Sequence, residues 1–162
     1  MEITLIKTIT MKKLLSILLF TLPFLGFGQS MNISWEDRDG REFSINTHSG
    51  NFQYSMISGD KIDYNDKYDD RHKSGIVGKV KSIGNVKIVY YEKYDDRHKS
   101  GIVGKVKSVG NVKIVYYEKY DDRHKSGIVG YIKAVGGLKV YYNEKYDDGP
   151  LGSIKNSSGS VN

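Results

Sequence analysis

The sequence predicts an all-β protein built as an antiparallel meander of tandem β-hairpins, in a single-layer or curled sheet. One segment of 26 residues occurs three times, at residues 67–92, 93–118 and 119–144. The first two copies differ only at Ile83, which is Val109 in the second copy. Repetition at a fixed period of roughly 20–50 residues is typical of arrays whose units pack on their neighbours. Val, Ile and Tyr dominate each copy and glycines separate them, which favours strands over helices.

Residues 1–28 have the pattern of a secretory signal peptide. A basic pair, Lys12-Lys13, precedes a largely apolar stretch at 14–25, and Gly26-Phe27-Gly28 provides small residues before a cleavage point. We expect Met11 to be the true start, with residues 1–10 belonging to a mis-assigned start. The alternative is an N-terminal membrane anchor, but the apolar stretch is short for a bilayer span.

The mature chain would begin at Gln29. Removal of Glu2, Lys7, Lys12 and Lys13 with the signal lowers the net charge from +6 to +4, which permits contact with anionic surfaces without requiring it. The chain has no cysteine, so we expect neither disulfides nor a lipid-bearing mature N-terminus. The expected location is secreted or periplasmic.

The mature chain divides into a hairpin, an array and a tail. Residues 29–48 are predicted to form an N-terminal hairpin that turns at Asp39-Gly40. The array is predicted at 49–155, beginning with a worn copy of the repeat. Residues 149–155 read as a capping strand, because Pro150 suits a sheet edge. Residues 156–162 are rich in Ser, Gly and Asn and are predicted to be disordered.

Each clean unit is predicted to hold two strands, at 76–82 and 86–94 in the first copy. A three-residue loop at 83–85 would set Val80 opposite Ile88 and keep apolar side chains on one face of the sheet. A two-residue loop would instead set Lys81 opposite Ile88. We therefore predict the three-residue loop.

The repeated Tyr and Lys side chains are the candidate binding surface. Aromatic rings stack on sugars or bases, and lysines contact anionic groups. The alternative is that the tyrosines fill a thin sheet while the lysines keep it soluble. The candidate binding residues are Tyr91, Tyr117, Lys87, Lys113, Lys79 and Lys105.

The repeated Asp-Asp-Arg-His sequence suggests a second possibility, a metal-ion-binding array or a metal-dependent hydrolase. A carboxylate and an imidazole close in sequence could share an ion, although a third ligand is not obvious. The simpler interpretation is a polar, solvated loop whose Asp side chains bond the backbone. The candidate ligands are Asp70, His72, Asp96, His98, Asp122 and His124.

The segment at 78–85, Gly-Lys-Val-Lys-Ser-Ile-Gly-Asn, is followed by Ile88, Tyr90 and Tyr91. In these residues the array resembles uncharacterised secreted β-hairpin repeat proteins of Gram-negative bacteria, and the resemblance extends over 49–155. It implies the hairpin fold and secretion, and no activity. A looser similarity is to the MORN repeat, from which this chain departs because its unit is longer and lacks the Tyr-x-Gly spacing, so lipid binding is not carried over.

Together these observations predict a non-enzymatic structural or binding module. Catalysis needs a concave, partly dry site, whereas the repeat offers equivalent copies of one exposed surface. No cofactor and no specific nucleic acid are expected. The expected partner is a polysaccharide or protein of the cell envelope.

Overall fold

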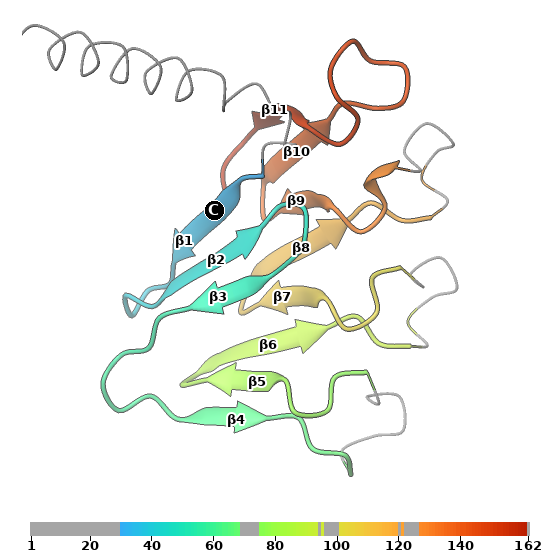
Figure 1. Cartoon of the computed structure of the whole chain (residues 1–162). Coiled ribbons are helices and arrows are strands. Elements are labelled where there is room, and N and C mark those ends of the chain that lie inside the picture. Colours follow the sequence, from blue (N-terminus) through green and yellow to red (C-terminus); the bar gives the residue numbers. More distant parts are fainter. Residues whose placement is uncertain are drawn as a thin grey trace, which may run out of the picture.

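The computed structural model describes residues 30–68, 75–93, 95, 101–119, 121 and 127–161. Within these residues the elements are eleven strands in two antiparallel sheets (Figure 1). The small sheet has the order β1 (Asn32–Glu36), β2 (Glu42–Asn46), β3 (Phe52–Tyr54). The large sheet runs in chain order through β4 (Ile62–Tyr64), β5 (Val80–Ile83), β6 (Val86–Tyr90), β7 (Val106–Val109), β8 (Val112–Tyr116), β9 (Ile132–Val135), β10 (Leu138–Tyr142) and β11 (Ile154–Ser158). The predicted all-β meander of hairpins is confirmed.

Each repeat forms a hairpin with a two-residue turn. In the first unit Ile83 pairs with Val86 and Ser82 with Lys87, which leaves Gly84 and Asn85 in the turn. The φ angle of Gly84 is +56°, a left-handed conformation that glycine adopts without strain. Asn85 keeps a negative φ, so the turn is of the kind with glycine at its first central position. The predicted three-residue loop is therefore wrong.

A β-bulge in the first strand of each unit explains this difference. Along β4 and β5, Asp63 pairs with Ser82 but Tyr64 pairs with Val80, so Lys81 is the extra residue. The bulge turns Val80 to the same face as Ile83, although three positions separate them. Lys81 consequently does not oppose Ile88, and the objection to a two-residue turn disappears. The same shift recurs between β6 and β7, between β8 and β9, and between β10 and β11.

Tyrosine hydroxyls add bonds within some hairpins and between neighbouring ones. The two strands of a unit are joined by two residue pairs next to the turn. Beyond those pairs, the Tyr90 hydroxyl donates to the Val80 carbonyl at 2.8 Å. The Tyr91 hydroxyl donates to the carbonyl of Ile114, in the next hairpin, at 3.0 Å. Burial raises the pKa of both phenols to about 12.

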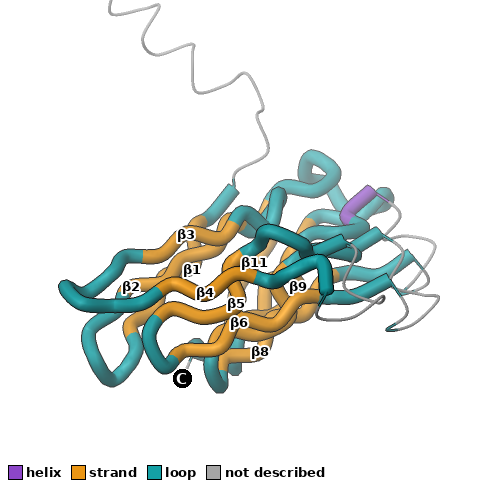
Figure 2. Tube along the Cα trace, turned by 90° about the horizontal axis from the view of Figure 1, so that it is seen from below, coloured by secondary structure: helices purple, strands orange, loops and turns teal. Residues whose placement is uncertain are grey.

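The small sheet covers part of the inner face of the large sheet, so the core lies between two layers (Figure 2). Ile33, Phe43 and Ile45 of the small sheet belong to the same buried cluster as the inner residues of the array. The link between β2 and β3 fixes this arrangement: the Thr47 carbonyl accepts bonds from the Ile132 N–H at 2.8 Å and from the Tyr142 hydroxyl at 3.2 Å.

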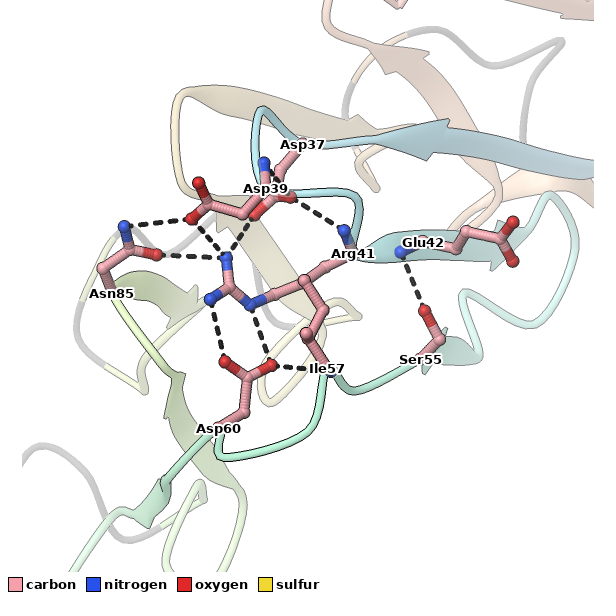
Figure 3. Close-up of polar contacts among 8 residues, drawn as sticks. All are labelled: Asp37, Asp39, Arg41, Glu42, Ser55, Ile57, Asp60 and Asn85. Atoms are coloured by element: carbon pink, nitrogen blue, oxygen red, sulfur yellow. Dashed lines mark hydrogen bonds and ion pairs between the residues drawn. The ribbon is translucent and has the colours of Figure 1, made fainter.

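At the other end of the small sheet, one arginine joins the two layers (Figure 3). The guanidinium of Arg41 contacts Asp37 at 2.9 Å and Asp39 at 2.7 Å in its own hairpin. It also makes two bonds to Asp60, at 2.9 and 2.8 Å, and one to Asn85 in the first repeat turn, at 3.2 Å. The side chains of Arg41 and Asp60 are both nearly closed off from solvent. These bonds tie the β1–β2 hairpin to the start of the array.

Several predicted boundaries need correction. The hairpin at Asp39-Gly40 has a three-residue loop, because the Asp37 N–H bonds the Arg41 carbonyl at 3.0 Å. The array does not begin at residue 49, since β3 pairs with β2 and the large sheet starts at β4. The cap is a strand as predicted, but it lies at Ile154–Ser158, so the first residues of the expected disordered tail at 156–162 are paired with β10.

Candidate functional site

The two tyrosines predicted to lie on an exposed binding face are core residues. Tyr91 is 4 % exposed and Tyr117 is 5 % exposed. The Tyr117 hydroxyl donates to the Val140 carbonyl at 3.2 Å, as Tyr91 does to Ile114 one unit earlier. Each ring packs edge-on against a tyrosine of the following unit. Regular alternation along the predicted strand at 86–94 would expose Tyr91, but β6 ends at Tyr90.

Lys79 and Lys105 also hold the array together. The Lys79 ammonium donates to the carbonyl of Gly104, in the next unit, and lies 5.5 Å from the centre of the Tyr90 ring. The Lys105 ammonium repeats this contact with Gly130 at 2.8 Å and adds a bond to Ser49 of the small sheet at 3.1 Å. Burial lowers the pKa of Lys105. These two predicted binding residues therefore have structural partners.

Three lysines of the bulges are paired with carboxylates. Lys107 lies 3.1 Å from Asp95, Lys133 lies 3.1 Å from Asp121, and Lys155 lies 2.7 Å from Asp147. Each of these Asp side chains also accepts the N–H of the Glu three residues before it, at 2.8–3.1 Å. Asp95, Asp121 and Asp147 thus each close a turn and pair with a lysine.

The remaining predicted lysines form an exposed row that we call the lysine ladder. Lys87 in β6 and Lys113 in β8 are exposed on the outer face of the large sheet, where each pairs across its hairpin with a serine. Lys139 in β10 takes the same position, opposite Ala134. Within the described residues none of the three has an ion pair. Because successive members are two strands apart, the ammonium groups repeat about every 10 Å across the sheet.

Apolar side chains run alongside the lysine ladder on the same face. Val89 and Val115 follow Lys87 and Lys113 by two residues and are half-buried. In the third unit this position holds Tyr141, whose side chain is 42 % exposed. The outer face therefore presents a row of exposed cations beside a strip of methyl groups that ends in an accessible aromatic ring. Lys139 and Tyr141 are not among the predicted binding residues, although an alignment of the third copy with the first two places them at the same positions as Lys87 and Val89.

The candidate metal ligands Asp70, His72, Asp96, His98, Asp122 and His124 all lie outside the described residues. In the part of the chain that the structure describes, no group of three or more His, Cys, Asp or Glu side chains is arranged to hold a metal ion. The same part contains no helix with the length and apolarity to cross a bilayer.

The charge and the regular spacing of the lysine ladder are compatible with an extended anionic ligand. Exposed ammonium groups at a regular spacing offer one contact per repeat, and their hydration keeps each contact weak, so binding depends on several contacts at once. The residues opposite the three lysines are small: two serines and an alanine. Comparison with protein-family models, with curated proteins and with solved structures gave no match.

Proposed function

We propose that the protein is a non-enzymatic binding module outside the cytoplasm, secreted or periplasmic, whose lysine ladder binds an extended anionic polysaccharide of the cell envelope. The observation that carries this proposal is the position of Lys87, Lys113 and Lys139 on one open face, without ion pairs among the described residues. The signal pattern in residues 1–28 supports the location.

The pairing of the other lysines supports the proposal. Lys107, Lys133 and Lys155 are paired with Asp95, Asp121 and Asp147, whereas the ladder lysines have no ion pair among the described residues. A polymer with a carboxylate or sulfate at regular intervals matches a surface with one cation per repeat. The exposed ring of Tyr141 adds a platform on which a sugar ring can stack.

The test compares two variants with equal loss of charge. One replaces Lys87, Lys113 and Lys139 with Gln, and the control replaces the exposed residues Arg38, Lys119 and Lys145 with Gln. Binding to alginate, a polyuronate, is measured by affinity electrophoresis, with neutral dextran as the second probe. The ladder variant should bind alginate about tenfold more weakly, because three exposed ion pairs of roughly 0.5 kcal/mol each amount to about 1.5 kcal/mol.

The control should bind like the unmodified protein, and added salt should weaken binding in both, because exposed charges are screened. Equal weakening in the two variants would show that net charge, and not the ladder, is responsible. Binding of dextran as strong as that of alginate would reject an anionic ligand. Circular dichroism of both variants checks that the sheets are intact.

A further inference from the structure

The two edge strands of the large sheet, β11 and β4, differ in polarity. At the C-terminal edge, Ile154 pairs with Tyr142 just as Ile132 pairs with Tyr116, so β11 corresponds to β9. In this alignment Ser157 takes the place of the fully buried Val135. β11 is therefore a polar terminal strand of the kind that closes repeat arrays.

The opposite edge, β4, has no such polar ending. Tyr64 corresponds to Tyr90, because Tyr64 pairs with Val80 as Tyr90 pairs with Val106. Tyr64 is 56 % exposed, whereas Tyr90 is 7 % exposed. Met56 and Ile57, in the segment that leads into β4, are exposed as well. Side chains that the interior units bury are thus left open at this edge.

The backbone of β4 is also open on this side. The Lys61 carbonyl accepts the Gly84 N–H at 2.9 Å, and the Asn65 N–H donates to the Lys79 carbonyl at 2.9 Å, so these groups point toward β5. In an antiparallel strand successive residues alternate in direction, and the N–H and C=O groups of Ile62 therefore point away from β5. Among the described strands none pairs with β4 there.

The sequence of β4 is complementary to itself. If two copies of the strand run antiparallel with Ile62 opposite Ile62, Lys61 of each copy lies opposite Asp63 of the other. Within one copy Lys61 and Asp63 form an ion pair at 3.2 Å, but both side chains are open to solvent, 84 % and 51 % exposed, so each can also reach its counterpart across the junction. The next possible register, with Ile62 opposite Tyr64, would instead place Asp63 opposite Asp63, which is unfavourable.

We propose that the protein forms a two-fold symmetric dimer by antiparallel pairing of the two β4 edges, with Lys61 facing Asp63 across the junction. Each copy presents the same surface, as a two-fold interface requires, and the large sheet continues from one copy into the other. Opposed residues of paired strands point to the same side, so the lysine ladders of the two copies lie on one continuous face. The dimer does not depend on the polysaccharide proposal.

Charge reversal at the junction provides a test. The molar mass in solution is measured by light scattering after size-exclusion chromatography and by sedimentation. The unmodified protein should have twice the mass of one chain. Lys61→Asp and Asp63→Lys each bring like charges together, so each variant alone should have the mass of one chain. Lys145→Asp, a reversal at an exposed position far along the chain, should leave the dimer intact.

Two rescue experiments identify the contact. The double variant Lys61→Asp/Asp63→Lys keeps the complementarity in exchanged form and should regain the doubled mass. An equimolar mixture of the two single variants should form a mixed dimer. At positions 61 and 63, one copy then carries two carboxylates and the other carries two ammonium groups. The competing explanation is that Lys61 protects the edge strand from pairing, which predicts the mass of one chain for the unmodified protein. A single-chain mass for the unmodified protein, or failure of both rescues, would overturn the dimer.

Discussion

Equivalent tyrosines of the repeat have different environments, so the differences between them arise from their places in the fold and not from the repeated sequence. Tyr90 and Tyr142 each donate a hydrogen bond to a carbonyl of the first strand in their own unit, at 2.8 and 2.9 Å. Tyr116 occupies the same position between them and is fully buried, but its hydroxyl has no partner among the described residues. Its ring lies under Gly50, where an added Cβ would approach within 3.0 Å. The turn between β2 and β3 thus packs directly on the Tyr116 ring of the middle unit.

Replacing Tyr116 with Phe should therefore leave the free energy of unfolding unchanged within about 0.5 kcal/mol, or raise it, because a desolvated and unpaired hydroxyl is removed. Tyr142→Phe is the matched control. It removes bonds to both Ile132 and Thr47 and should lower the free energy of unfolding by about 1–3 kcal/mol. Urea unfolding followed by circular dichroism measures both. An equal loss in the two variants would mean that the Tyr116 hydroxyl does have a bonded partner.

At the scale of the element, the bulge decides which side chains enter the core. The spacing Val-x-x-Val in β7 places Val106 and Val109 on the same face only because Lys107 is accommodated as an extra residue. Both valines are buried, whereas the Lys107 ammonium reaches Asp95 at the surface. Regular alternation would expose one of the two valines.

Deleting Lys107 should consequently be far more harmful than replacing it. The deletion restores regular pairing and turns Val106 or Val109 outward, which should cost at least about 2 kcal/mol of unfolding free energy for the lost burial. Lys107→Ala keeps the bulge and removes one exposed ion pair, so its cost should stay below about 1 kcal/mol. Thermal and urea unfolding of both variants provide the measurement. If the two changes prove equally mild, the bulge does not set the register.

The same element explains what the sequence could predict. The second strand of each unit alternates regularly, so the outward position of Lys87 and Lys113 and the inward position of Ile88 follow from the pattern. The first strand contains the bulge, and no local pattern distinguishes a bulged residue from a loop one residue longer. The burial of Tyr91 depends on a carbonyl of the next unit, a contact that becomes visible only when the hairpins are placed side by side.

At the scale of the whole molecule, the three-stranded sheet contacts all three clean units of the array. Arg41 contacts Asn85 in the first unit, Ser49 accepts a bond from Lys105 in the second, and Thr47 accepts one from Ile132 in the third. His48 continues this line to the C-terminal cap, with its Nε2 atom 3.0 Å from the Gly152 carbonyl. The small sheet therefore acts as a brace across units that otherwise contact only their neighbours.

The arginine at the start of this brace should make stability depend on acid. Hydrogen bonds from Arg41, followed by the Ile57 N–H, lower the pKa of Asp60. A carboxyl whose pKa is lower in the folded than in the unfolded state contributes stability above its unfolded pKa, near 4, and this contribution is lost as the pH falls through the lower folded value. Arg41→Met removes the cause of the shift. The difference in unfolding free energy between the unmodified protein and this variant should thus be largest near neutral pH and shrink below about pH 4.

Arg38→Met is the matched control, because Arg38 lies in the same loop and is exposed. It should leave both the stability and its pH dependence close to those of the unmodified protein. Urea unfolding at a series of pH values distinguishes the two arginines. A difference for Arg41→Met that stays constant across the acid range would show that its side chain stabilises the junction by packing alone. The charge of Asp60 would then have no part in holding the small sheet to the array.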